Sequence, residues 1–169
     1  MAGYPDVAAK IDAFFARVEA RHGGDMQCQT GCSDCCHTTL SVTAVEAEAI
    51  RREVAGWDPA RRAALGEVGP HPKGVGSRGS SLAHCAALDV AGRCKIYAAR
   101  PFVCRSHGAP IRMREGSLPV VQSCFRNFTE TAPDADCILD QTTLSALSLA
   151  VNGGATERID LADLLASLC

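Results

Sequence analysis

The sequence predicts a small α+β domain that is mostly helical, has short β-hairpins and is organised around cysteine-ligated metal. Three observations lead to this fold class. Apolar residues recur at helical spacing in several segments, short apolar runs flank glycine-containing turns, and ten cysteines occur in 169 residues. A chain of this length corresponds to about one domain, so residues 1–169 are expected to form a single domain with its core motif in residues 28–126.

The first helix is predicted over residues 5–21. Its apolar residues recur three and four positions apart, which places them on one stripe that packs against a core. The sequence His22-Gly23-Gly24 then ends the helix and leads into the first cysteines. The stripe consists of Val7, Ile11, Phe14, Phe15 and Val18.

Two further helices are predicted before a loop. Thr43 and Glu46 form a capping box, so a helix should follow to about Ala55, after a short extended piece over 37–42. Asp58-Pro59 should start another helix that ends near Glu67. Four glycines and two prolines make 69–81 a loop.

The second half of the chain alternates turns, hairpins and helices. One hairpin should turn around Asp89–Gly92 and bring Cys85 close to Cys94. A single helical turn over 96–100 should break at Pro101, and a second hairpin over 109–122 should turn near 115–117. Asp140 should cap a helix over 141–151, and a short helix is expected over 160–168.

The segment Cys28-Gln-Thr-Gly-Cys32-Ser-Asp-Cys35-Cys36 holds four thiols within nine residues and favours tight turns. Such a cluster serves as a disulfide framework, a zinc site or an iron–sulfur cluster. Charged residues interrupt any N-terminal signal peptide, and no apolar run approaches the roughly 20 residues needed to span a bilayer. We therefore expect a cytoplasmic protein, in which these thiols bind metal rather than pair as disulfides.

Eight cysteines are predicted to be metal ligands, because close-spaced clusters are usually completed by distant residues. Successive side chains usually diverge, so Cys35 and Cys36 are expected to serve different centres or different roles. Cys137 and Cys169 look like a buried and a terminal small residue instead. The predicted ligands are Cys28, Cys32, Cys35, Cys36, Cys85, Cys94, Cys104 and Cys124.

The thiols alone leave the metal open, because thiolate ligands suit both zinc and iron–sulfur clusters. The spacing matches neither a regular zinc finger nor paired C-x2-C knuckles. Cys28-x3-Cys32-x2-Cys35 has the spacing of the radical-SAM triad, but the chain lacks the length and the repeated βα units of those enzymes. Three histidines, His37, His84 and His107, lie within three residues of a predicted ligand.

These motifs together resemble the YkgJ-like cysteine-cluster family over about residues 28–126. The resemblance implies a zinc- or iron-chelating domain, also described as an Fe–S-cluster-containing protein, and it favours a [4Fe–4S] cluster with zinc as the alternative. Flagellin lysine N-methylases carry a similar cluster, which implies electron or group transfer. Besides the eight cysteines, the matching residues are Gly92-Arg93, Ile96-Tyr97, Arg100-Pro101 and Arg105.

The arginines beside the predicted ligands have two interpretations. Arg100 and Arg105 either offset the negative charge of the thiolates or form an anion-accepting mouth of the metal site, covered by the loop 69–81. A net charge of −2 gives no general attraction to nucleic acid or membrane, so the expected partner is a protein or a small molecule. An enzyme and a zinc-stabilised binding or metal-handling module both remain open.

Overall fold

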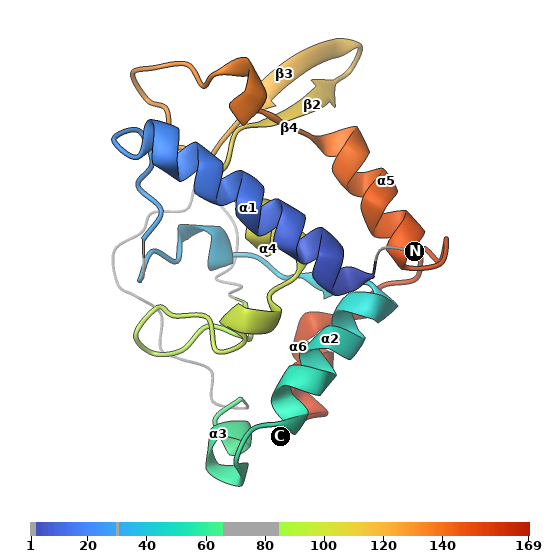
Figure 1. Ribbon diagram of the computed structural model, residues 1–169. Coiled ribbons are helices and arrows are strands. Elements are labelled where there is room, and N and C mark those ends of the chain that lie inside the picture. The colour runs from blue at the N-terminus through green and yellow to red at the C-terminus, as the bar shows by residue number, and fades with distance from the viewer. Residues whose placement is uncertain (1–2, 30, 66–84) are drawn as a thin grey trace. The chain divides into compact units, whose positions relative to one another are not determined.

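The computed structural model describes residues 3–29, 31–65 and 85–169 (Figure 1). In these residues it has six α-helices and short strands in two small sheets, which confirms the α+β class. The chain divides into two compact units. Unit 1 comprises Met1–Cys28 and Phe102–Ala155, and unit 2 comprises Gln29–Pro101 and Thr156–Cys169. The single domain stays a prediction.

Unit 1 is built on the long helix α1 (Tyr4–His22), which confirms the helix predicted over 5–21. Val7, Ile11 and Val18 are buried along its apolar stripe. The ring of Tyr4 stacks on Phe102, 4.9 Å between centroids, where α4 (Phe102–Ser106) begins. The sequence did not predict α4. Pro101 ends the preceding turn, and a proline is also tolerated at a helix start, where no backbone donor is needed.

The sheet of unit 1 combines a predicted hairpin with an unpredicted strand. β2 (Ile111–Glu115) and β3 (Leu118–Gln122) are antiparallel and turn through Gly116, whose φ of 61° suits glycine. β4 (Leu139–Asp140) pairs with β2 in parallel and leads into α5 (Gln141–Val151). The Asp140 side chain accepts the Thr143 N–H at 2.8 Å, which confirms the predicted cap. The 3₁₀ helix η3 (Ala135–Cys137) precedes β4.

Unit 2 starts its regular structure with β1 (Ser41–Val42) and α2 (Ala44–Ala55). The capping box is confirmed, because the Glu46 carboxylate accepts the Thr43 N–H at 2.8 Å and Thr43 Oγ1 accepts the Glu46 N–H. α3 (Pro59–Ala63) begins at the predicted cap Asp58. The helix ends earlier than predicted, because residues 64–65 form a turn, and the last two predicted helix residues and the loop 69–81 lie outside the described residues.

The C-terminal segment returns to complete the core of unit 2. β5 (Ile159–Asp160) pairs antiparallel with β1, and α6 (Leu161–Ala166) follows it, lying beside α2 in Figure 1. The Asp160 side chain caps α6 by accepting the Ala162 N–H at 2.8 Å. The core of this unit gathers Val42, Ala47, Ile50, Val54, Trp57, Leu65, Cys85, Ala87, Ile96, Ala99, Leu161, Leu164 and Leu165.

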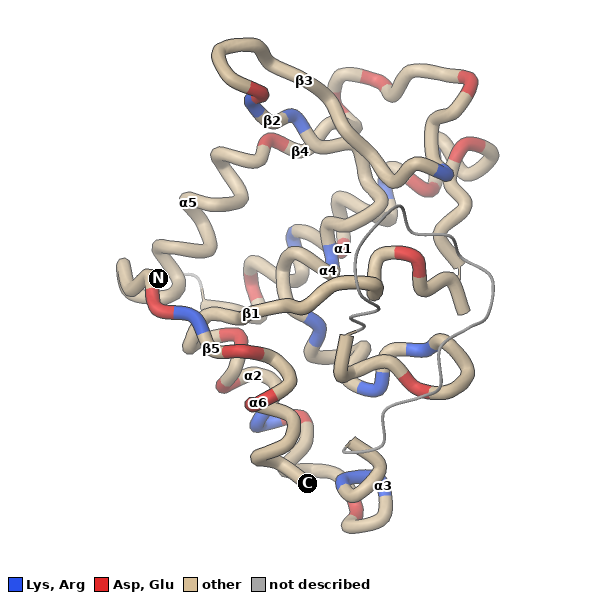
Figure 2. The backbone as a smooth tube through the Cα atoms, turned by 180° about the vertical axis from the view of Figure 1, so that it is seen from behind, with Lys and Arg blue, Asp and Glu red and all other residues tan. Residues whose placement is uncertain are grey.

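Acidic and basic residues are interspersed along the backbone of each unit (Figure 2). None of the helices in the described ranges has the length and apolar character that crossing a bilayer requires.

Replacing Thr43 with alanine should lower the free energy of unfolding by about 1–2 kcal/mol, because α2 loses its N-cap and the buried Glu46 carboxylate loses the Thr43 hydroxyl. Urea unfolding of the full chain measures this change. The matched control is Thr38→Ala, which removes an exposed hydroxyl of the same unit. Equal losses for the two variants would show that the capping box does not stabilise α2.

Candidate metal centre

Two adjacent thiols lie on the 3₁₀ helix η1 (Asp34–Cys36) of unit 2. The turn closes through a hydrogen bond from the Cys36 N–H to the Ser33 carbonyl at 2.8 Å. Cys35 Sγ and Cys36 Sγ lie 4.0 Å apart. The sequence led us to expect divergent side chains, but in this tight turn both sulfurs are near enough to serve one centre.

A second segment brings two more thiols to the same region. The Cys85 N–H donates to the Cys36 carbonyl at 2.7 Å, which joins the two segments directly. Leu88 and Cys94 then form an isolated antiparallel bridge across the predicted turn, so Cys85 and Cys94 lie on its two arms. The Asp89 carboxylate accepts the backbone N–H groups of Ala91 and Arg93, both at 2.8 Å, and so holds the turn closed.

The turn approaches the first cysteine segment at Gly92, whose φ is 75°. A Cβ on this residue would lie 3.2 Å from the Gly31 carbonyl oxygen, so glycine permits the close approach of the two backbones. We call Cys35, Cys36, Cys85 and Cys94 the four-thiol set.

Each of these four thiols acts on the pKa of another member of the set. A hydrogen bond with Cys36 lowers the pKa of Cys35 to about 7, whereas the same bond, burial and the charges of Cys35, Cys85 and Cys94 raise the pKa of Cys36. Burial raises the pKa of Cys85 and raises that of Cys94 to about 11. Removing the protons of Cys36, Cys85 and Cys94 is therefore unfavourable unless a cation replaces them, whereas Cys35 loses its proton more readily.

Arg100 supplies a nearby positive charge. Its charge acts to lower the pKa values of Cys35 and Cys94, although burial outweighs it for Cys94. The guanidinium lies 4.1 Å from the ring centroid of Tyr97 on η2 (Tyr97–Ala99), the predicted helical turn. The predicted role of Arg100 in offsetting thiolate charge agrees with this position.

Arg105, the other predicted anion-binding arginine, lies in unit 1 and has a structural partner. Its side chain is only 8% exposed and its guanidinium donates to the Asp12 carboxylate at 2.5 Å, which ties α4 to α1. The sequence analysis did not predict this carboxylate partner of Arg105.

Cys28 of unit 1 is held by a residue that the sequence analysis did not single out. The Asn127 side-chain amide donates to Cys28 Sγ at 3.2 Å and to the Gly108 carbonyl at 2.8 Å, and its oxygen accepts the Gln27 N–H at 2.8 Å. Asn127 is 3% exposed. Its only sequence signal is its place three residues after Cys124, which is a weak one.

The remaining predicted residues lie in different settings. Cys32 is half-buried in the turn before η1, and Cys104 and Cys124 are half-buried in unit 1. Cys137 is fully buried, and Cys169 is exposed with its thiol donating to the Leu165 carbonyl at 3.4 Å. His37 is half-buried, His107 is exposed, and His84 lies outside the described residues.

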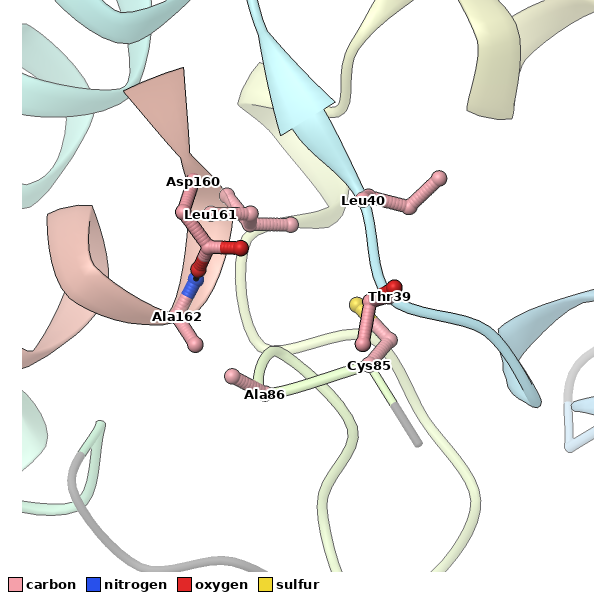
Figure 3. A pocket seen from close by; sticks show the side chains of 7 residues that line it. All are labelled: Thr39, Leu40, Cys85, Ala86, Asp160, Leu161 and Ala162. Atoms are coloured by element: carbon pink, nitrogen blue, oxygen red, sulfur yellow. Dashed lines mark hydrogen bonds between the residues drawn. The ribbon is translucent and has the colours of Figure 1, made fainter. Parts of the chain in front are cut away.

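A small pocket of unit 2 reaches one thiol of the four-thiol set. Asp160, Leu161 and Ala162 line one side of it, and Thr39 and Leu40 line the other, with Cys85 beside Thr39 (Figure 3). The anion-accepting mouth predicted from the sequence involved Arg100 and Arg105, and neither residue lines this pocket.

All ten cysteines are free thiols. Within unit 2 the four-thiol set offers four soft sulfur donors with a cationic neighbour, and this chemistry fits both zinc and an iron–sulfur cluster. The described residues can therefore hold such a group without a histidine or carboxylate.

A protein-family model, CxxCxxCC, described as "Putative zinc- or iron-chelating domain", matches residues 27–124. The match starts one residue before Cys28 and ends at Cys124, the first and last predicted ligands, and it confirms the YkgJ-like resemblance. No curated protein and no solved structure matches the chain. Because residues 27–124 make up more than half of its length, the chain belongs to the CxxCxxCC family of metal-chelating domains.

Proposed function

We propose that the four-thiol set holds a [4Fe–4S] cluster and that the protein acts in electron or group transfer. The gathering of four thiols from two separate segments of unit 2 carries this proposal. When bound, such a cluster supplies reversible electron transfer at a potential set by its surroundings. The family description, which names iron or zinc, supports metal binding by these cysteines.

The residues around the thiols have defined tasks in this proposal. The backbone bond between Cys85 and Cys36 holds the two ligand segments together, and the Asp89 turn fixes the spacing of Cys85 and Cys94. Arg100 offsets part of the thiolate charge, which favours the more negative, reduced state of the centre. Cys28, Cys32, Cys104 and Cys124 stay predicted ligands.

The partner we propose is a protein or a small molecule that meets unit 2 in a reducing, cytoplasmic environment. The pocket beside Cys85 gives such a partner an approach to one ligand thiol. A cytoplasmic site also agrees with ten free thiols, since that compartment keeps cysteines reduced.

Anaerobic purification followed by analysis of iron, acid-labile sulfide and zinc tests the proposal. We expect a brown protein with iron and sulfide in equal amounts and a broad visible absorption that bleaches on reduction. A colourless protein with stoichiometric zinc and no sulfide would contradict the cluster and support the alternative, a zinc-stabilised binding or metal-handling module.

A further inference from the structure

A second group of ligand atoms lies in unit 1, at the C-terminal end of α1. One ligand atom each from His22, Asp134 and Cys137 lie within 4.8 Å of one another. His22 is the last residue of α1, while Asp134 and Cys137 begin and end the turn that contains η3. All three lie outside the segment 27–124 that the family model matches.

The imidazole of His22 lies between two carboxylates, one near each of its nitrogens. Nδ1 lies 3.6 Å from Asp25 Oδ2, and Nε2 lies 3.4 Å from Asp134 Oδ2. A tautomer with its proton on Nδ1, facing Asp25, leaves the Nε2 lone pair directed at Asp134. The Asp134 N–H also reaches Nε2, but at a long 3.4 Å. A carboxylate near one nitrogen, with the lone pair of the other directed at the metal, is the usual arrangement of a zinc-ligating histidine.

Packing against neighbouring side chains holds the His22 imidazole and the Cys137 sulfur in place. The Phe128 ring contacts the imidazole edge-on, 5.2 Å between centroids, and the Phe128 N–H donates to the Asp25 carbonyl at 3.0 Å. Cys137 is fully buried against Val18 and Met26. Asp134 is 59% exposed, so the third donor faces solvent and is free to adjust.

Arg21, which lies near the three donors, pairs mainly with a fourth residue, Asp136. Arg21 donates to both Asp136 oxygens, at 2.7 and 2.6 Å, and lies 3.7 Å from Asp134. Asp136 first, and Cys137 after it, raise the pKa of Arg21. Asp136 is therefore the main partner of the guanidinium, which also lies near Asp134 and Cys137, the two anionic donors toward His22.

We propose that His22, Asp134 and Cys137 form a zinc site that is separate from the four-thiol set and keeps a fourth position open to solvent. Imidazole, carboxylate and thiolate are all common zinc ligands, and three protein ligands with one open position are typical of exchangeable or catalytic zinc. A neutral imidazole with two anionic donors balances the charge of Zn²⁺. This assigns Cys137 a role beyond that of the buried small residue expected from the sequence.

Zinc and cobalt titrations of the full chain test this site, with the ligands of the four-thiol set saturated beforehand by anaerobic iron and sulfide. The parent should bind one further equivalent of Co²⁺ with the visible bands of tetrahedral cobalt and a thiolate charge-transfer band. Asp134→Asn should lower the affinity for this additional Co²⁺ at least about tenfold. Even residues that only hydrogen-bond to metal ligands contribute about 10–100-fold to metal affinity.

The matched control is Glu130→Gln, which removes the same charge from an exposed carboxylate in the same loop and should bind like the parent. Cys137→Ser should abolish the thiolate band while far-ultraviolet circular dichroism stays that of the parent. If Cys137→Ser does not fold, the Co²⁺ affinities of Asp134→Asn and Glu130→Gln are sufficient to test the site. Equal affinities in those two variants, or no further equivalent in the parent, would overturn the site.

Discussion

The Cys36→Ser variant is expected to lose metal from the four-thiol set and to unfold at a clearly lower urea concentration than the parent. Cys36 Sγ lies 4.0 Å from Cys35 Sγ, and its backbone carbonyl accepts the Cys85 N–H. Serine keeps that backbone bond but replaces a soft thiolate with a poor ligand for iron or zinc. Because metal binding contributes directly to the folding free energy, both losses should appear together.

Metal content per chain and urea unfolding, measured on the same preparation, test this expectation. Cys169→Ser is the control, since Cys169 is exposed and its thiol donates to the Leu165 carbonyl of α6. After a chelator removes the metal, parent and Cys36→Ser should unfold at similar urea concentrations. Full metal content in Cys36→Ser would exclude Cys36 as a ligand.

The Gly108→Ala variant should lose about 2–4 kcal/mol in the free energy of unfolding. Gly108 has a φ of 96°, which an L-residue rarely adopts, and an added Cβ would lie 2.6 Å from Cys28 Sγ. That sulfur is fixed by the Asn127 amide, which also donates to the Gly108 carbonyl. The clash should therefore displace the Cys28 thiol as well as strain the backbone.

Urea unfolding and the rate at which a thiol reagent modifies Cys28 measure the two effects. Gly116→Ala is the matched control, because Gly116 also has a positive φ, 61°, but a Cβ there would have no atom within 4 Å. This variant should show the backbone strain alone, about 1 kcal/mol, and no change at Cys28. If both variants lose the same stability, the contact between Gly108 and Cys28 does not constrain the site.

Local signals in the sequence predicted most helices and one hairpin. Thr43 with Glu46, Asp58 and Asp140 marked the starts of α2, α3 and α5, and Gly116 marked the turn between β2 and β3. These signals depend on residues only a few positions apart, so the sequence contains them directly. The spacing of the cysteines likewise identified the family.

Pairings between distant segments were decided by the tertiary structure. β1, β4 and β5 have two residues each, too few for any alternating pattern, and they exist because β1 meets β5 and β4 meets β2. The helix α4 follows Pro101, which the sequence marked only as the end of a turn.

The sequence by itself determined which residue types are available for metal, because a dense set of cysteines supplies the soft thiolate ligands that zinc and iron bind. Only the tertiary structure decided which donors meet. It joins Cys36 to Cys85 by a backbone bond, places Asn127 against Cys28, and brings Cys137 to His22 at the end of α1. Each of these contacts joins residues that are far apart in the sequence, so forming it costs loop-closure entropy. The packing of a whole unit offsets that cost, and no local sequence pattern encodes this packing.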